Sequence, residues 1–328
     1  MNTINFSSSD SDYFLYPRYT ISEGIAKDLG LDLGIFNIST GRASEEEAFQ
    51  LSILDWCQKR WGSQEYHLRI EAAKQMLECY FSEESELEIE YWNLASLPEN
   101  FSFPKLKRLY LDRNNLTSLP KKFHCPMLES LSLCGNPLGS FPEKLNNHPN
   151  LEFIELIDCN LKSMPENLRL EKLKSLNLGR NWLTTLPEDL DFPELREFNL
   201  EENELTSLPE NFNFSKLIDL DVSSNKDMQE LPTSLYDCAH LKFLLTWETE
   251  IPEEMVESIL NGRKELRYGR NPDEEEAAVP PDDMRTSPEV TGEIGFSLLY
   301  DGKLSQSSTR PNPSADEGEC EIMENADT

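Results

Sequence analysis

The chain contains few of the residues that form catalytic and metal-binding sites. It has only four histidines among 328 residues, and no two of its seven cysteines form a C-x-x-C pair. Protein zinc sites are built from closely spaced Cys and His ligands, so we expect no metal. The sequence shows no Ser/His/Asp, Cys/His, paired-acid or phosphate-loop pattern, so we also expect no enzyme activity, no cofactor and no small-molecule substrate.

The chain also lacks long apolar segments. No apolar run approaches the length of a membrane helix, and the N-terminus has no basic region followed by an apolar core. We therefore expect neither membrane insertion nor a cleaved secretory signal peptide. The odd number of cysteines, with no pairs bracketing the central region, predicts reduced thiols in a cytoplasmic environment.

Basic residues are scarce relative to acidic ones. The chain has 30 Lys and Arg against 61 Asp and Glu, which gives a formal net charge of −31. Nucleic acids and anionic membrane surfaces are bound through basic patches, so we expect neither as a main ligand. Two interpretations of the charge remain: it favours basic partner proteins, or it serves only solubility.

Leucine, by contrast, is abundant and recurs at fixed intervals. The pattern L-x-x-L-x-L-x-x-N-x-L-x-x-L-P returns every 22 to 24 residues, in copies that start at Leu106, Leu128, Leu151, Leu173, Leu195 and Leu217. Weaker copies in the same register contain Leu87 and Leu241. This period predicts an α/β repeat solenoid, a leucine-rich-repeat horseshoe of about eight units over residues 84–247, with one short strand per repeat.

Each position of the repeat has a predicted role, counted from the first leucine of a copy. Positions 4 and 6 have the spacing of one strand face and point to the core. The apolar–proline pair at positions 14 and 15 suits an outer return limb, because proline cannot donate to a ladder. Position 9 carries a short amide or thiol that can bond the buried backbone of its own turn and of the next. This structural column consists of Asn114, Asn136, Cys159, Asn181, Asn203 and Asn225.

The segment before the repeats divides into two predicted parts. Residues 1–43 are rich in Ser, Thr, Asn and Asp, so we expect a disordered leader, either a secretion signal or an ordinary terminus. Residues 44–83 predict a hairpin of two helices that covers the first repeat. Ser44 and Glu47 have the spacing of a capping box, and apolar residues recur at helical spacing on both sides of Gly62.

The segment after the repeats also divides into two. Residues 248–270 predict a C-terminal helical cap, with a helix from Pro252 to Leu266. From residue 271 to 328 the chain is acidic and rich in Pro and Ser, which predicts a disordered tail. One apolar island in this tail, residues 294–300, is either a short docking motif or inert.

The predicted concave face of the sheet is where a partner protein would bind. Positions 3, 5, 7 and 8 point to solvent there, and aromatic residues and arginines are enriched in binding hot spots. An ordinary solvated sheet face is the plainer interpretation for any single one of these positions. The candidate partner-binding residues are Tyr91, Tyr110, Arg113, Phe153, Ile157 and Arg180, ringed by Glu201 and Glu202.

The order of segments and one helix motif carry a family resemblance. The motif runs through Trp56, Arg69, Ala72, Ala73, Met76, Leu77 and Cys79 and leads into Leu87-Glu-Ile-Glu and Leu94-Ala-Ser-Leu97-Pro98. Over roughly residues 44–250 the chain resembles the LPX-class leucine-rich-repeat effectors that Gram-negative pathogens inject by type III secretion. The resemblance implies a virulence protein that is secreted into the host cytoplasm or nucleus, binds host proteins and modulates host signalling.

Two branches of that family differ in their C-terminal part. One adds a large ubiquitin-ligase domain with a catalytic cysteine in a Cys-x-Asp setting. Here Cys320 lies in Glu-Cys-Glu-Ile, and about 60 residues follow the predicted cap, so we expect no ligase activity. The other branch, typified by the Yersinia outer protein M, is an acidic solenoid without an enzyme domain. The chain is more similar to this second branch, with a helical cap like that of the first.

Two departures from the family pattern leave alternatives open. The type III repeats are mostly about 20 residues long, whereas these are mostly 22 or 23, a length that also resembles resident intracellular scaffolds. A glutamate-rich C-terminal block also suits type IV secretion. The alternatives are therefore a resident cytoplasmic scaffold or regulator, and a substrate-recognition module related to the ligase branch without its catalytic domain.

Overall fold

The computed structural model describes residues 3–5, 20–31, 44–60, 62–212 and 214–260. The predicted acidic tail, with its apolar island, lies outside these residues. So does the part of the predicted C-terminal helix that follows Leu260. The described helices contain none that is long and apolar enough to cross a membrane.

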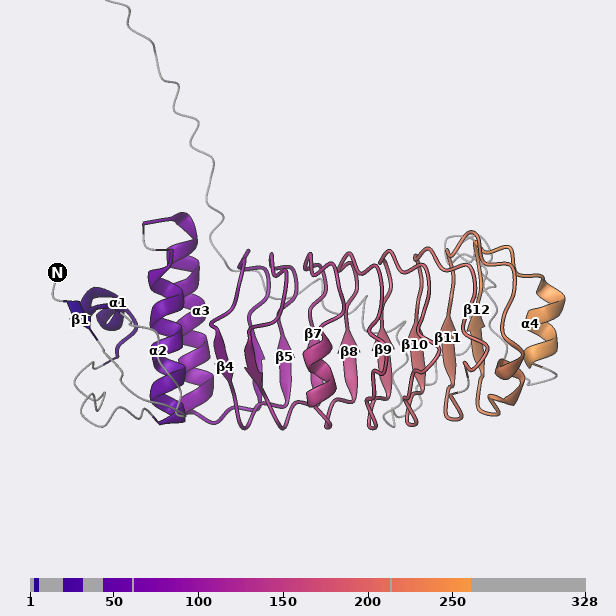
Figure 1. Ribbon diagram of the computed structural model, residues 1–328, viewed down its shortest axis with the longest axis horizontal. Helices are drawn as coiled ribbons and strands as arrows, with labels where there is room; N and C mark the ends of the chain where they lie inside the picture. Colours follow the sequence, from indigo (N-terminus) through magenta and orange to yellow (C-terminus); the bar gives the residue numbers. More distant parts are fainter. Residues whose placement is uncertain (1–2, 6–19, 32–43, 61, 213, 261–328) are drawn as a thin grey trace, which may run out of the picture. The chain divides into compact units, whose positions relative to one another are not determined.

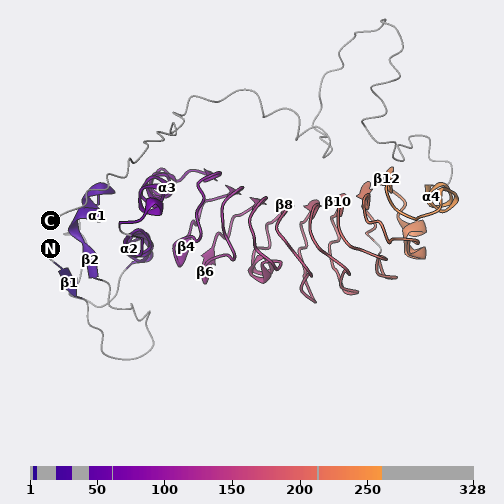
Figure 2. The same ribbon diagram turned by 90° about the horizontal axis from the view of Figure 1, so that it is seen from above.

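The repeats form a leucine-rich-repeat solenoid, as the period predicts. Eight parallel strands of the described chain lie side by side in one sheet, in sequence order (Figures 1 and 2). Equivalent positions pair between turns, so that Leu109 stands opposite Leu87 and Leu131. The strands are β3 (Glu86–Glu88), β5 (Arg108–Tyr110), β7 (Ser130–Ser132), β8 (Phe153–Glu155), β9 (Ser175–Asn177), β10 (Glu197–Asn199), β11 (Asp219–Asp221) and β12 (Phe243–Leu245).

The core lies behind this sheet and is closed by the return limbs. The leucines at positions 4, 6 and 11 are fully buried, as Leu109, Leu111 and Leu116 show. On the far side, β4 (Asn100–Ser102) pairs in parallel with β6 (Lys122–His124). The 3₁₀ helices η2 (Glu143–Asn147) and η3 (Thr233–Asp237) follow prolines at their N-caps. Because one turn cannot bury its own leucines, the turns stabilise one another by stacking.

The asparagine column links each turn to its neighbour. In Asn203, Nδ2 donates to the carbonyl oxygens of Leu178 and Leu200 at 2.9 and 3.0 Å. Its Oδ1 accepts from the Leu183 amide at 3.0 Å. The asparagines at 114, 136, 181 and 225 make the same set of bonds. At Cys159 the thiol donates to the Leu133 carbonyl at 3.2 Å.

Position 8 has a left-handed backbone in every turn. The φ angle is +62° at Tyr91, +51° at Arg113 and +56° at Arg180, and only one turn uses glycine there, Gly135 at +67°. A side chain in this region raises the conformational energy by about 1–2 kcal/mol, and the surrounding hydrogen bonds must hold it there. Several of the predicted binding residues therefore project from a turn whose backbone is fixed.

Two helices cover the first turn of the solenoid. They are α2 (Glu45–Gln58), which begins at a capping box of Ser44 and Glu47, and α3 (Gln64–Phe81). Helix α2 contacts β4, and α3 contacts β3. Their attachment depends on Arg69, whose side chain is almost fully buried.

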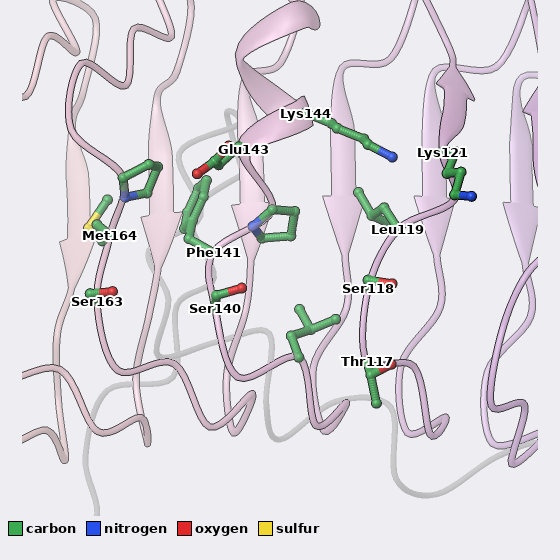
Figure 3. Close-up of a pocket in the computed structure, with 13 residues that line it drawn as sticks. Thr117, Ser118, Leu119, Lys121, Ser140, Phe141, Glu143, Lys144, Ser163 and Met164 are labelled. Carbon is green, nitrogen blue, oxygen red and sulfur yellow. The ribbon is translucent and has the colours of Figure 1, made fainter.

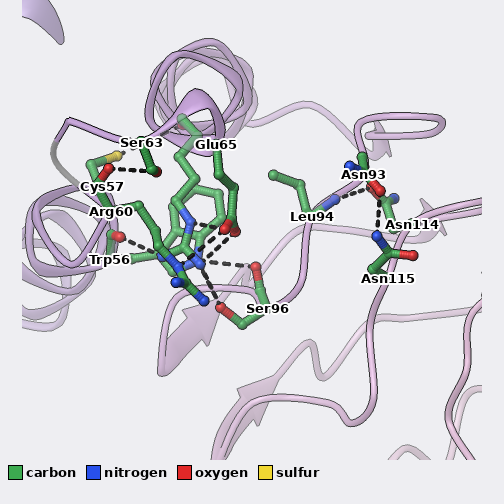
Figure 4. A network of polar contacts seen from close by, with 11 residues as sticks. Trp56, Cys57, Arg60, Ser63, Glu65, Asn93, Leu94, Ser96, Asn114 and Asn115 are labelled. Carbon is green, nitrogen blue, oxygen red and sulfur yellow. Dashed lines mark hydrogen bonds and ion pairs between the residues drawn. The ribbon is translucent and has the colours of Figure 1, made fainter.

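Arg69 joins both helices to the first repeat through Trp56, Glu65 and Ser96, which are labelled in Figure 4. Its Nη1 donates to the Trp56 carbonyl at 2.6 Å, and its Nη2 donates to Ser96 Oγ at 3.0 Å and to Glu65 at 2.7 Å. The guanidinium also lies 4.7 Å from the centre of the Trp56 ring. The indole nitrogen of Trp56 donates to the Ser96 carbonyl at 3.0 Å. The helix motif of the family resemblance is therefore a contact that attaches α2 and α3 to the solenoid.

Part of residues 1–43, which the sequence predicts to be a disordered leader, forms regular structure. Strand β1 (Thr3–Asn5) pairs antiparallel with β2 (Thr20–Ser22), and helix α1 (Glu23–Asp28) follows. In α1, Ile25 and Ala26 are buried, and this helix contacts α2. The apolar residues of α1 are too few to give a helical pattern that differs from that of a loop. The segment acquires its structure by packing on α2.

The last described helix, α4 (Glu253–Leu260), follows the final turn. Its apolar face, formed by Val256, Ile259 and Leu260, is buried. The hydroxyl of Tyr236 in η3 donates to Ser258 Oγ at 3.2 Å, which attaches α4 to the last complete return limb.

Candidate binding surface on the sheet

The solvent side of the eight-stranded sheet is formed by positions 3, 5, 7 and 8 of each turn. We call this side the open face; it is the side that the sequence predicts to be concave. In β5, β10 and β11 the central residue is buried, and its two neighbours on the opposite side are half-buried. Because neighbouring turns pair in register, equivalent side chains form columns across the open face.

At the N-terminal end of the open face, a cation lies on an aromatic ring. Tyr91 is 63% exposed, and the guanidinium of Arg113 in the next turn stands 5.4 Å from its ring centre. An arginine over a tyrosine is attracted by the negative face of the ring. The Tyr91 amide donates to the Asp112 carbonyl at 2.9 Å, so the two turns are also fixed by their backbones.

The remaining candidates are less exposed than expected, and they do not form one patch. Phe153 is 44% exposed, but Tyr110 and Ile157 are half-buried. Burial and the neighbouring Glu86 carboxylate raise the pKa of Tyr110. The β7 turn carries only small residues at these positions, so it separates the Tyr91–Arg113 pair from Phe153 by one strand.

Arg180 is paired rather than free for a partner. Its Nε donates to Glu202 Oε1 of the next turn at 3.1 Å, and both side chains are about half exposed. Glu201 is half-buried, not exposed. Burial, with the nearby carboxylates of Asp221 and Glu202, raises the pKa of Glu201 to about 7. Burial therefore favours the neutral form of one of the two glutamates that were predicted to ring the site.

A polar cluster between β5 and β8 was not predicted. Ser132 Oγ and the Cys134 amide both donate to Asp112 Oδ1, at 2.6 and 2.8 Å. Burial raises the pKa of Asp112 and of Glu155 in β8. The only sequence signal was a run of polar residues at positions 5 and 7 of consecutive copies, which an ordinary solvated sheet would also show.

A second cluster, at the C-terminal end of the open face, was also missed. Position 3 of β10 and positions 3 and 5 of β11 carry acids, and β12 carries apolar side chains in the same columns. Asp219 stands opposite Glu197 on one side and Phe243 on the other, and Asp221 stands opposite Leu245. Burial, with the Asp221 and Glu197 carboxylates, raises the pKa of Asp219 to about 7. We call Glu197, Asp219, Asp221, Phe243, Leu245 and Trp247 the acid–aromatic patch.

On the opposite side, the return limbs form one groove of about 450 Å³. Ser118, Ser140 and Ser163, which come from three successive turns, lie along it (Figure 3). Phe141 and Lys121 also line it. None of the predicted binding residues contributes to this groove, whose charged lining residues are Lys121, Glu143 and Lys144.

The buried cysteines contribute to packing. Burial raises the pKa of Cys57, Cys79, Cys125 and Cys159 to about 12. A thiol with such a pKa is protonated at neutral pH and is a poor nucleophile or metal ligand. In the described part of the chain, no three Cys, His, Asp or Glu side chains are grouped so that they could hold a metal ion. The open face is suited to binding through charge, aromatic rings and shape.

Parallel strands in register, an asparagine ladder and proline-bearing return limbs define the class of the protein: it is a leucine-rich-repeat solenoid. The LRR domain of a Shigella effector is similar, with a TM-score of 0.55 and 21% identity over 69% of this chain and 97% of that domain. YopM from Yersinia pestis, described as a leucine-rich effector protein, has a TM-score of 0.50 and 24% identity over 63% of this chain and 61% of its own. No protein-family model and no curated protein matches the sequence.

Proposed function

We propose that the protein is an interaction scaffold that binds a partner protein on the open face. The observation that carries this proposal is the exposed pair of Tyr91 and Arg113, which projects from backbone fixed in a left-handed turn. Rigid aromatic and arginine side chains contribute most of the binding energy in many interfaces, because little entropy is lost when they bind. Phe153, two strands further along the sheet, would extend the contact.

We further propose that the partner is a host protein and that the chain is a secreted effector that modulates host signalling. The helix motif around Arg69 and the fold shared with the Shigella and Yersinia proteins support this proposal. A resident intracellular scaffold, or a substrate-recognition module without a ligase domain, remains the alternative function.

Affinity capture from a eukaryotic cell lysate, read by mass spectrometry, tests the binding surface. The full chain would be compared with Tyr110→Ala/Arg113→Glu/Phe153→Ala on the open face. The matched control is Tyr236→Ala/Arg169→Glu/Phe81→Ala, which changes the same residue types at exposed sites elsewhere. We expect a protein that is held by the full chain and the control and lost with the open-face variant. A partner kept by all three chains would refute the open face as the site.

Secretion is tested separately from binding. Residues 1–40 would be fused to a reporter and expressed in bacteria with and without a working type III or type IV system. Export that depends on either system supports an effector. Retention of the reporter in both strains would favour the resident scaffold.

A further inference from the structure

The acid–aromatic patch lies at the end of the sheet opposite the Tyr91–Arg113 pair. Its three acids lie on β10 and β11, and Phe243 and Leu245 lie on β12 in the same register. Leu244 between them is buried, so Phe243 and Leu245 project from the other side of the strand and are half-buried. Trp247, at position 7 of the same turn, lies on the same face and is also half-buried.

The acids of the patch have no salt-bridge partner in the described chain. Elsewhere in the solenoid, acids are paired with a base one turn away, as Glu152 with Lys174 at 2.7 Å and Glu194 with Lys216 at 2.5 Å. No ion pair between the described residues involves Glu197, Asp219 or Asp221. Burial, and after it repulsion from the Asp221 and Glu197 carboxylates, raises the pKa of Asp219. A cation placed over them would relieve this repulsion.

A buried hydroxyl in the same column is also unsatisfied. Ser223 follows Asp221 at position 7 and is fully buried, and its amide donates to Asp221 Oδ1 at 2.9 Å. Its Oγ meets the geometric criteria for a hydrogen bond with no described residue, although it lies close enough to the Asp221 carboxylate to lower the pKa of that group. Native structures leave few buried hydroxyls unpaired, and such groups often mark a site that a ligand or water completes. Ser223 lies between Glu201 and Trp247 in the position-7 column.

The spacing of the acids favours an extended chain rather than a single ion. Asp219 and Asp221 are two residues apart on one strand, which places them about 7 Å apart along it. Side chains on one face of an extended peptide recur at the same interval. From position 3 to position 7 the patch spans about 13 Å along the strands.

We propose that the acid–aromatic patch binds an extended protein segment that carries Lys or Arg at alternate positions together with large apolar side chains. The cations would lie over Asp219 and Asp221, and the apolar side chains would contact Phe243, Leu245 and Trp247. This inference rests on the proposed function, since it names the partner chemistry for one part of the open face.

The test uses fluorescence anisotropy with the full chain and a defined probe at about 0.15 M salt, where distant charges are screened. The probe is a fluorescein-labelled decapeptide whose alternate residues, which share one face of the extended chain, are Lys or Arg together with Leu or Phe, with Thr between them. One control peptide keeps the basic residues and replaces Leu and Phe by Ser, and the other keeps Leu and Phe and replaces Lys and Arg by Gln.

The site is tested with two double variants that remove the same charge. Asp219→Asn/Asp221→Asn alters the patch, whereas Glu88→Gln/Asp158→Asn alters exposed acids elsewhere on the open face. We expect the first pair to weaken probe binding roughly tenfold or more and the second less than about twofold. Trp247→Ala should weaken binding of the probe but not of the Ser-containing control peptide. Equal losses in both double variants would show diffuse attraction to an acidic chain and would overturn the inference.

Two further results would also count against a partner segment at this patch. Residues 261–270 contain Arg263, Lys264, Arg267 and Arg270. If replacing these four by Ser tightens probe binding several-fold, the patch is occupied by the chain's own segment and the assignment to a partner fails. If a captured partner is lost with Tyr110→Ala/Arg113→Glu/Phe153→Ala but kept by Asp219→Asn/Asp221→Asn, the proposed function stands and this inference falls.

Discussion

Gly135 leaves the space in which Arg113 lies. A Cβ on Gly135 would stand 3.2 Å from Arg113 Cγ, closer than an ordinary van der Waals contact. Arg113 extends from that position over the ring of Tyr91 in the preceding turn. Residues of three successive turns, Tyr91, Arg113 and Gly135, therefore determine the surface at this end of the open face. Arg113 can lie over Tyr91 because Gly135 has no side chain.

We expect Gly135→Ala to lower the free energy of unfolding by about 1–3 kcal/mol, because it adds left-handed strain and crowds Arg113. The matched control is Gly139→Ala. Gly139 has a similar φ of +72°, but a Cβ there would meet nothing within 4 Å. The control should therefore show the strain alone. Equal losses for the two variants in urea denaturation would show that Arg113 moves aside freely.

Arg69 should be essential for the attachment of α2 and α3. Arg69→Met would remove the side-chain donor to the Trp56 carbonyl and the buried cation that pairs with Glu65. Ser96 Oγ and Glu65 would keep only their contacts with Trp56 Nε1 and Arg60. Removing one partner of a buried, hydrogen-bonded ion pair lowers stability by roughly 3–5 kcal/mol. The control Lys74→Met breaks an exposed pair with Glu71 and should change stability by less than about 1 kcal/mol. Chemical denaturation followed by tryptophan fluorescence measures both, and a similar small loss for both would contradict the prediction.

The asparagine column should matter more than its surface counterparts. Asn203→Ala removes the donor to two buried carbonyls and the acceptor for the Leu183 amide. Each unsatisfied buried group destabilises the fold by about 1–3 kcal/mol, so we expect a total loss of roughly 3 kcal/mol or more. Asn147→Ala, at an exposed site in η2, should be nearly neutral. A loss below about 1 kcal/mol at Asn203 would mean that the turns relax to satisfy their own backbones.

The solenoid itself could be predicted from the sequence because many positions agree independently. Leu109 and Asn114 are defined by their columns, and the structure buries both. The exposure of Tyr110 and Ile157 could not be predicted. The repeat pattern shows which positions belong to the open face, but it is the same for all of them and does not indicate how exposed each side chain is. How deeply each side chain lies depends on the size of its neighbours in the two adjacent turns.

The acid–aromatic patch was missed for a different reason. The copy that begins at Leu241 has Thr246 at position 6 and Thr249 at position 9, so its pattern degenerates. The backbone nevertheless keeps its register with β11. Phe243 therefore remains on the open face, although only Leu241 and Leu244 of this copy match the repeat pattern. The raised pKa values of the neighbouring acids depend on contacts between turns, so they cannot be predicted from the sequence of a single repeat.

The acids of this patch should lower stability at neutral pH, which pH-dependent denaturation can measure. Asp219 has a pKa of about 7 in the folded chain, against about 3.9 in an unfolded one. Its folded-state pKa is raised, so its contribution to stability is fully present below pH ~4 and is lost as the pH rises through about 7. Asp219→Asn removes this loss. We expect the free energy of unfolding of the variant, relative to the parent, to grow between pH 4 and 7 and then level off.

At pH 8 the gain should be about 1–2 kcal/mol, less than the full pKa shift implies, because the side chain is partly solvated. Asp158→Asn, at an exposed position of the open face, is the matched control. A constant difference for Asp219→Asn at all pH values would show that its carboxylate titrates normally. The same variant can also be tested for binding of the basic–apolar probe. If Asp219→Asn gains stability and loses affinity for the probe, the protein keeps a destabilising acid at a position where binding requires it. That combination is expected of a functional site and not of a surface adapted only for solubility.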